Sequence, residues 1–200
     1  MAIRLYWCPQ TRAIRALWLL EELGVPYELA KVDVRAGAQS DPAFRAVSPL
    51  GKVPALVDGE TAVAESGAVC LYLADRYPQA KLAPALDSPQ RGPYLRWMFF
   101  GPGCIEPAFT DRTLKRDGAI PHLSAAWGSF DSVVATLRDG LARGPYLLGE
   151  DFSAADVLIG SMLQWGVVTG MLPNEAPFKD YVARLGARPA LQRALRIDGA

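Results

Sequence analysis

The 200-residue sequence is poor in the groups on which several classes of protein depend. It holds one histidine, His122, so it offers no cluster of histidines and cysteines that could bind a metal ion. Its 21 basic and 21 acidic residues give a formal net charge of zero. Bulk charge therefore gives no reason to expect binding to nucleic acid or to an anionic membrane. No apolar run approaches the length of a membrane-spanning helix.

Cysteine is scarce as well. Cys8, Cys70 and Cys104 are an odd number of thiols, lie far apart, and lack the paired spacing of a disulfide framework. Residues 1–7 alternate like a strand and do not contain the apolar stretch of a secretion signal. Free thiols persist in a reducing compartment, so we expect a cytoplasmic protein.

The apolar pattern that is present predicts a mixed first part of the chain, complete by about Tyr77. Strands are expected at 3–7, 27–34, 53–57 and 61–64, and helices at 11–23 and 66–76, with a loop or irregular helix at 36–48. Gly24 stands where a left-handed residue ends the first helix, and Pro26 prevents its continuation. The order is strand, helix, strand, loop, strand, strand, helix.

A segment rich in proline, serine and glycine follows, and beyond it the sequence favours helices alone. These are expected at 90–100, 119–142, 154–169, 177–186 and 189–196. The change from mixed to helical indicates two domains. We predict an α/β domain over 1–80, a linker over 81–90 and an all-α domain over 91–200.

The third of these helices has the clearest start signal. Ser153 and Asp156 have the spacing of a capping box, in which each side chain reaches the other residue's backbone N–H. The pattern predicts a helix start at residue 154 and no chemical role for the two residues.

The start of the first helix is suited to hold an anion. A helix N-terminus carries unpaired N–H groups and partial positive charge, so acids are expected there and bases at the other end. Here Arg12 and Arg15 lie early and Glu21 and Glu22 lie late. This reversal attracts an anion to the helix start, unless both arginines pair with acids elsewhere in the fold.

A thiolate is an anion with a use at this position. A free thiol has a pKa of about 8.5, and lowering it by about two units needs roughly 2.7 kcal/mol of preferential stabilisation of the anion. Thr11 places a hydroxyl at the helix start, where threonine also serves as an ordinary N-cap. Tyr6 offers a second hydroxyl, although its place in a strand favours packing.

Two further segments are suited to bind a peptide. At Glu65-Ser66 a strand meets a helix start, where a hydroxyl and N–H groups suit a carboxylate and the Glu65 side chain suits an ammonium. At Val53-Pro54 a strand begins with a proline. If that bond is cis, as about one in twenty X–Pro bonds are in folded proteins, the Val53 N–H and C=O face outward and can pair with an extended peptide.

Taken in order, these motifs resemble those of cytosolic glutathione transferases, with N-terminal motifs of the bacterial, theta-like and beta-like kind. The resemblance rests on Leu5-Tyr6, Thr11-Arg12-x-x-Arg15, Glu21-Glu22-Leu23-Gly24, Pro49-x-Gly51-Lys52-Val53-Pro54, Glu65-Ser66 and Ser153-x-x-Asp156. It covers nearly the whole chain. It implies the glutathione transferase fold, a thioredoxin-like N-terminal domain followed by an all-α domain.

The resemblance also implies where glutathione binds. A cis bond precedes Pro54, Val53 hydrogen-bonds the cysteinyl backbone of glutathione, and Lys52 binds the glycyl carboxylate. Glu65 and Ser66 hold the γ-glutamyl end. Glutathione is then a co-substrate, and the reaction needs neither a metal nor a separate cofactor.

The same resemblance places the second substrate, a small apolar electrophile, against the helical domain. Trp97, Phe100 and Ile105 are the expected lining residues in the aromatic segment 94–109, with core packing as the alternative for some of them. Gly101-Pro102-Gly103 is expected to interrupt the helix of that segment. Proteins of this family are usually homodimers, so a homodimer is implied.

The residue that activates the thiol is left between three candidates. Thr11 falls where many members of the family carry Ser and one bacterial class carries Cys, so it is the first choice, with Cys8 and Tyr6 as alternatives. Cys8-Pro9 resembles the start of a redox motif, and a second hypothesis is a glutathione-dependent thiol-disulfide oxidoreductase that uses Cys8. A third hypothesis is a glutathione-fold binding protein without catalysis.

Overall fold

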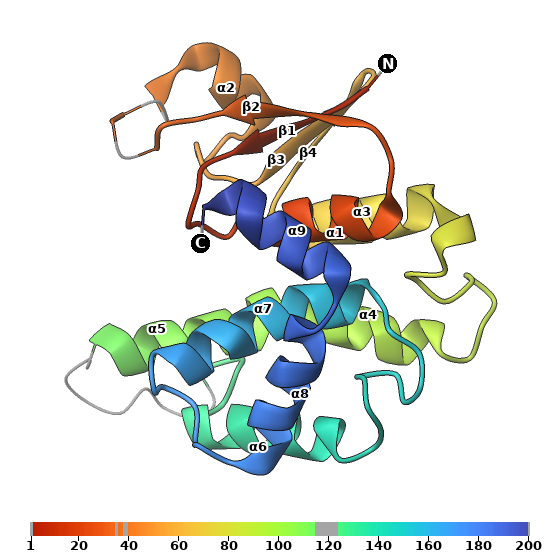
Figure 1. Ribbon diagram of the computed structural model, residues 1–200. Coiled ribbons are helices and arrows are strands. Elements are labelled where there is room, and N and C mark those ends of the chain that lie inside the picture. The colour runs from red at the N-terminus through yellow and green to blue at the C-terminus, as the bar shows by residue number, and fades with distance from the viewer. Residues whose placement is uncertain (1, 35, 38–39, 115–123, 200) are drawn as a thin grey trace. The chain divides into compact units, whose positions relative to one another are not determined.

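The computed structural model describes residues 2–34, 36–37, 40–114 and 124–199 (Figure 1). The chain divides into two compact units. The first consists of the residues up to Leu82 together with those from Gly186 onward, and the second runs from Ala83 to Leu185.

A four-stranded sheet with the order β2-β1-β3-β4 forms the centre of the first unit. Its strands are β1 (Ile3–Trp7), β2 (Tyr27–Lys31), β3 (Ala55–Asp58) and β4 (Thr61–Ala64). Strand β1 pairs in parallel with β2 and antiparallel with β3, which pairs antiparallel with β4. Strand β3 begins two residues later than expected, because Pro54 has no N–H to donate to a neighbouring strand.

Helices cover both faces of this sheet (Figure 1). They are α1 (Ile14–Leu23), α2 (Pro42–Val47) and α3 (Ser66–Arg76), followed by the short 3-10 helix η2 (Pro78–Ala80). On one face α1 packs against α3, and on the other Phe44 of α2 forms a small core with Val32 and Ala55. Gly24 ends α1 in the left-handed conformation, at φ 63°, as the sequence predicts. The expected α/β order of this unit is confirmed.

The last helix, α9 (Pro189–Asp198), also belongs to the first unit. It buries Ala190, Leu191 and Ala194 and packs along α1. The sequence assigned residues 91–200 to one helical domain, and the structure differs for the residues from Gly186 onward. The apolar stripe of α9 is readable in the sequence, but the helix that it covers is not, because α1 lies more than 160 residues away.

The second unit is helical. It contains α4 (Arg91–Phe100), the π-helical turn η3 (Gly101–Ile105), α5 (Glu106–Leu114), α6 (Phe130–Leu141), α7 (Ala154–Val168) and nearly all of α8 (Ala176–Gly186). Helix α7 is buried on most of its surface. Helices α6 and α4 pack closely, since a Cβ added at Gly140 would lie 2.6 Å from the Trp97 ring. The predicted all-α character of this part of the chain is confirmed.

Two helix boundaries in this unit differ from expectation. The helix predicted at 119–142 begins at Phe130, because Gly128 at φ 73° turns the chain and Ser129 and Ser132 form a capping box; residues 119–123 of that prediction lie outside the described residues. At Gly101-Pro102-Gly103 the helix widens into η3 and continues as α5, so the segment is a π-helical bulge instead of a break.

The capping box predicted at the start of α7 is confirmed. Asp156 Oδ2 accepts hydrogen bonds from the Ser153 N–H at 2.9 Å and from the Ser153 hydroxyl at 3.1 Å. The other carboxylate oxygen accepts from the Leu147 N–H at 2.9 Å and from the Tyr181 hydroxyl at 2.8 Å. Asp156 therefore ties α7 to α8 and to the loop before α7.

Among the described residues, no helix has the length and apolar character needed to cross a membrane.

Candidate functional site

The register of the sheet brings three of the predicted segments to one end of the first unit. Tyr6 lies opposite Ala55, and Ala55 lies opposite Ala64. Strand β1 ends just after Tyr6, β3 begins at Ala55, and β4 ends at Ala64. The loop after β1, the Val53-Pro54 segment and the Glu65-Ser66 segment therefore emerge side by side. Since neighbouring strands lie about 4.8 Å apart, the outer two of these segments start about 10 Å from each other.

The loop after β1 carries Cys8 and Thr11. The Thr11 hydroxyl donates a hydrogen bond to the Cys8 carbonyl at 2.6 Å and accepts one from the Ala13 N–H at 3.2 Å. These bonds hold residues 11–13 in turns, and α1 starts at Ile14 instead of at residue 11 as expected. The hydroxyl is thus an N-cap-like group in a half-buried position at the end of the sheet.

The two early arginines of α1 have different environments. Arg15 is 7% exposed and lies in the core with Cys70 of α3. Burial raises the pKa of the Cys70 thiol to about 12, and the nearby Arg15 charge opposes that rise. Arg12 is exposed. Of this pair, Arg12 is therefore the one placed to contribute positive charge where a ligand can reach it.

The segment before β3 is held by Ser48. The Ser48 hydroxyl donates to the Lys52 carbonyl at 2.8 Å and accepts from the Lys52 N–H at 3.0 Å. Gly51 lies between them at φ 64°, a left-handed conformation that favours glycine. The Val53–Pro54 bond is cis, as the resemblance implies. Pro54 is buried, Val53 is half-buried and the Lys52 side chain is exposed.

The Glu65-Ser66 segment has an unusual backbone. Glu65 has φ 72° and ψ 125°, a region that non-glycine residues rarely adopt. Such a conformation costs on the order of 1–3 kcal/mol and is found mainly where a site requires it. Ser66 is the first residue of α3, a helix of 11 residues, and the Glu65 carbonyl accepts from the Val69 N–H at 2.9 Å. Glu65 itself is exposed, with its carboxylate at the helix start.

The two alternatives to Thr11 have different environments. The Tyr6 ring packs on Phe44, with ring centroids 5.5 Å apart, on the face of the sheet that α2 covers. Cys8 is 3% exposed. Cys8 is therefore less exposed than the half-buried Thr11, whereas Tyr6 is half-buried as well. The packing expected for Tyr6 is confirmed.

The three residues expected to line the second-substrate site all lie in the second unit. Trp97 and Ile105 are buried in its core, and Phe100 is half-buried. The Trp97 and Phe100 rings meet edge to face with centroids 5.5 Å apart, and the Arg96 guanidinium lies 4.4 Å from the Trp97 centroid. The structure therefore brings Trp97 and Phe100 together and leaves Phe100 as the accessible one of the three.

Two residues that contact this site were not identified from the sequence. Ser48 stands before Pro49. In the sequence, only its closeness to the Lys52-Val53-Pro54 motif could have indicated a role at this site. Asp198 accepts a hydrogen bond from the Gln10 N–H at 2.9 Å. Its only signal is an acid in the last turn of a helix, where the helix dipole disfavours negative charge.

The site can bind through backbone groups, hydroxyls and charges at two helix starts. Among the described residues, no group of three His, Cys, Asp or Glu side chains is placed to hold a metal ion. The end of the sheet can therefore receive a polar, extended molecule through Val53, and anionic groups near Thr11 and Ser66. The Glu65 carboxylate adds a receptor for an ammonium.

Two models of known protein families match the chain. Residues 1–75 match the N-terminal domain of glutathione S-transferase. Residues 120–193 match the C-terminal domain of glutathione S-transferase.

Individual proteins match over most of the chain. An uncharacterized GST-like protein from Streptococcus mutans is 30% identical, over 90% of this chain and 74% of its own length. The disulfide-bond oxidoreductase YfcG from Escherichia coli is 29% identical, over 96% of this chain and 94% of its own. Among solved structures, a sphingomonad glutathione S-transferase complexed with glutathione is 30% identical, covers 98% of both chains and has a TM-score of 0.79.

Proposed function

Because the chain belongs to the glutathione S-transferase family, we propose that it is a glutathione transferase that joins the glutathione sulfur to a small apolar electrophile. The thiolate attacks an electrophilic carbon, a carbon–sulfur bond forms, and a leaving group departs with its electron pair. In an addition, the electron pair moves instead to the acceptor and is then protonated. Glutathione is a co-substrate, and the proposed reaction uses no metal and no separate cofactor.

Glutathione lies in this proposal along the end of the sheet, with its γ-glutamyl group at Glu65 and Ser66. The observation that carries it is the convergence of three segments, set by the pairing of Tyr6 with Ala55 and of Ala55 with Ala64. The rare backbone of Glu65 supports it, because strain of this kind gathers at ligand sites. The exposed Glu65 carboxylate receives the ammonium, and the start of α3 receives the carboxylate.

The middle and the glycyl end of glutathione fall to the segment that Ser48 holds. Val53 pairs with the cysteinyl backbone as an added strand would. Lys52 has an exposed ammonium next to Val53, which suits the glycyl carboxylate. Glutathione-bound structures of similar proteins support this ligand.

Thr11 is the proposed activator of the thiol. Its hydroxyl lies at the end of the sheet and at the start of α1, where positive potential favours a thiolate. In the structure the hydroxyl proton is directed at the Cys8 carbonyl, 2.6 Å away. Donation to sulfur therefore requires rotation about the Cβ–Oγ1 bond. The charge-assisted hydrogen bond to the thiolate then replaces the bond to the Cys8 carbonyl.

The electrophile is proposed to rest against the helical unit. Phe100 is the most accessible of the three expected residues, whereas Trp97 and Ile105 act by supporting the inner wall. An apolar surface of this kind selects substrates by their hydrophobicity more than by their shape. The electrophile class is therefore proposed only as small and apolar.

Two further expectations belong to this proposal. Three free thiols support a reducing compartment such as the cytoplasm. A homodimer is proposed from the family. It is supported by large exposed apolar side chains, because Leu50 and Phe99 are each 68% exposed. Sedimentation velocity of the purified chain at several concentrations tests the dimer, and a monomer at all of them contradicts it.

The decisive experiment compares the wild type with Glu65→Gln. Glutathione binding is measured by calorimetry, and conjugation is measured with 1-chloro-2,4-dinitrobenzene. We expect the wild type to bind and conjugate, and Glu65→Gln to bind glutathione about 10-fold or more weakly with little change in melting temperature. Absence of glutathione binding by the wild type contradicts the proposal. Binding with the thiol's ultraviolet titration at its free value supports instead a binding protein without catalysis.

A thiol-disulfide oxidoreductase is the second candidate, because a relative that matches 96% of this chain is a disulfide-bond oxidoreductase. In this chain the candidate nucleophile Cys8 is 3% exposed, and a reaction at its sulfur requires the loop to open. Cys8→Ser separates the two functions. Loss of glutathione-dependent disulfide reduction with conjugation retained favours a second activity at Cys8, and no change in either removes this candidate.

A further inference from the structure

Asp198 lies at the C-terminal end of α9 and contacts the loop that carries Thr11. Its carboxylate is almost completely buried, with 3% of the residue exposed. Oδ1 accepts a hydrogen bond from the Trp7 indole N–H at 2.8 Å, and Oδ2 accepts one from the Gln10 backbone N–H at 2.9 Å. One carboxylate therefore bridges two positions on either side of Cys8.

These two contacts hold the loop after β1 on either side of Cys8, next to a residue with an uncommon backbone conformation. Trp7 is the last residue of β1, and Gln10 has φ 56°, a left-handed conformation that is uncommon for a residue other than glycine. Between them lies Cys8, whose carbonyl receives the Thr11 hydroxyl. The backbone that holds the Thr11 hydroxyl is therefore the same backbone that Asp198 holds.

A buried carboxylate at the position of Asp198 is destabilising unless hydrogen bonds such as these compensate for it. Negative charge at a helix C-terminus opposes the helix dipole, and a buried carboxylate loses its hydration. Two charge-assisted N–H bonds offset that cost. An apolar residue at this position would avoid the cost and leave the indole N–H and the Gln10 N–H without their acceptor.

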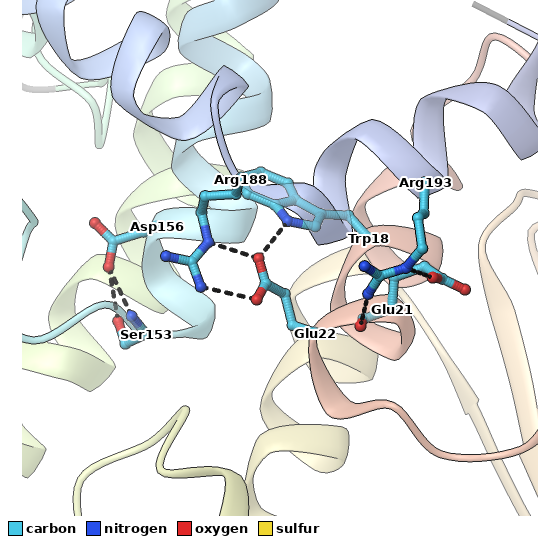
Figure 2. A network of polar contacts seen from close by, with 7 residues as sticks. All are labelled: Trp18, Glu21, Glu22, Ser153, Asp156, Arg188 and Arg193. Carbon is cyan, nitrogen blue, oxygen red and sulfur yellow. Dashed lines mark hydrogen bonds and ion pairs between the residues drawn. The ribbon is translucent and has the colours of Figure 1, made fainter.

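The N-terminal half of α9 and its N-cap residue are bonded to the C-terminal end of α1. The Arg188 guanidinium donates to both Glu22 carboxylate oxygens, at 2.6 and 2.8 Å. Arg193 donates to the Glu21 carboxylate at 2.6 Å and to the Glu21 carbonyl at 2.8 Å (Figure 2). These bonds hold α9 along α1. Asp198, at the C-terminal end of α9, is the residue through which this helix contacts the loop after β1.

We propose that Asp198 is a positioning residue for thiol activation, which acts through the Trp7 indole and the Gln10 N–H to set the place of the Thr11 hydroxyl. The inference rests on the proposed function, in which Thr11 stabilises the glutathione thiolate. Asp198 does not touch the substrate in this scheme. It sets the geometry from which the hydroxyl turns toward sulfur.

The test compares Asp198→Asn and Trp7→Phe with the control Arg193→Gln, which weakens the hold of α9 on α1 far from the loop. For each folded protein the ionisation of bound glutathione is titrated by thiolate absorbance near 240 nm, together with the pH profile of kcat/KM for conjugation. Asn keeps one acceptor oxygen and places an NH2 group against the second donor. We expect Asp198→Asn to shift both profiles upward by about one pH unit and to lower kcat/KM about 10-fold at neutral pH. Trp7→Phe is expected to give a smaller shift in the same direction.

Arg193→Gln is expected to lower the melting temperature while leaving both pH profiles in place. If Asp198→Asn also lowers the melting temperature but leaves the profiles unmoved, Asp198 has only a structural role and the inference is overturned. If the wild type itself does not ionise bound glutathione, the proposed function fails first, and the inference fails with it. Only a wild type that ionises the thiol and an Asp198→Asn variant that does so equally well overturn this inference alone.

Discussion

The Ser48 hydroxyl holds the backbone of Lys52 from both sides, since it donates to the Lys52 carbonyl at 2.8 Å and accepts from the Lys52 N–H at 3.0 Å. Ser48 is 1% exposed. One buried hydroxyl thus fixes the loop from which the exposed Lys52 side chain and the Val53 backbone reach the proposed glutathione site.

Ser48→Ala should therefore loosen this loop. We expect a loss of about 1 kcal/mol in the free energy of unfolding, because one oxygen that satisfies two backbone groups is removed. Glutathione affinity should fall about 10-fold, which calorimetry can measure. Ser88→Ala is the matched control, since the Ser88 hydroxyl also accepts from a backbone N–H, that of Gln90 at 3.2 Å, in the second unit. Equal glutathione affinity in both variants would contradict the role given to Ser48.

Replacement of Thr11 tests the source of thiol activation. Thr11→Val keeps the shape of the side chain and removes the hydroxyl, and we expect kcat/KM for conjugation to fall about 10²–10³-fold. Thr11→Ser keeps the hydroxyl and should stay within a few-fold of the wild type. The titration of bound glutathione by ultraviolet absorbance should move toward its free value in Thr11→Val only. If the Val variant ionises the thiol as well as the Ser variant does, backbone N–H groups or another side chain are responsible.

The Glu22 carboxylate should contribute measurably to the stability of the first unit. It accepts from two of the three guanidinium nitrogens of Arg188 and from the Trp18 indole N–H, the latter at 2.8 Å, and its side chain is 9% exposed (Figure 2). Glu22→Gln removes the charge from a largely buried pair, and we expect a loss of about 1–3 kcal/mol in the free energy of unfolding by urea. The control is Arg4→Gln, which breaks the exposed pair of Arg4 with Glu28 and should leave stability unchanged. Equal effects of the two substitutions would show that the Glu22 contacts do not contribute to stability.

The Cys70 thiol should make the protein less stable in alkali. Burial raises its pKa from the ordinary 9.0 to about 12 in the folded chain. The unfolded chain therefore loses this proton first, and stability is full below about pH 9 and declines as the pH rises from 9 toward 12. Comparison of Cys70→Ala with the wild type at pH 7 and pH 10 cancels the other titrating groups. The wild type should lose about 1.4 kcal/mol more than the variant over that interval.

The same burial predicts slow chemistry at this thiol. Cys70 should react with a thiol reagent such as 5,5′-dithiobis(2-nitrobenzoate) only after unfolding, whereas the half-buried Cys104 should react in the folded protein. Rapid reaction of Cys70 at pH 8 would contradict its complete burial on α3.

Much of the first unit could be predicted from the sequence because local patterns determine it. Strand β1 and helix α3 have the expected bounds residue for residue, since period-two alternation and a helical stripe are clear there. The segments of the proposed glutathione site could be predicted because each lies at the end of a strand or the start of a helix. The sheet register that unites them is not local, and only the structure shows it.

Other features could not be predicted because they depend on distant partners. The reversed charges of α1 are one example, since the sequence does not show that Glu21 and Glu22 meet Arg193 and Arg188. The role of Trp97 is another example. The local sequence around an aromatic residue on a helix is the same whether that residue faces a ligand or the core. Its contact with Gly140 places it in the core.

The return of α9 to the first unit has a consequence for the order in which this protein is made. Domains generally fold as units during synthesis, the N-terminal one first. Here β1 and α1 leave the ribosome long before α9, the helix that covers α1 and carries the carboxylate that accepts from Trp7. The first unit therefore cannot reach its final form until residue 198 has emerged from the exit tunnel, and until then the apolar face of α1 that α9 covers stays exposed.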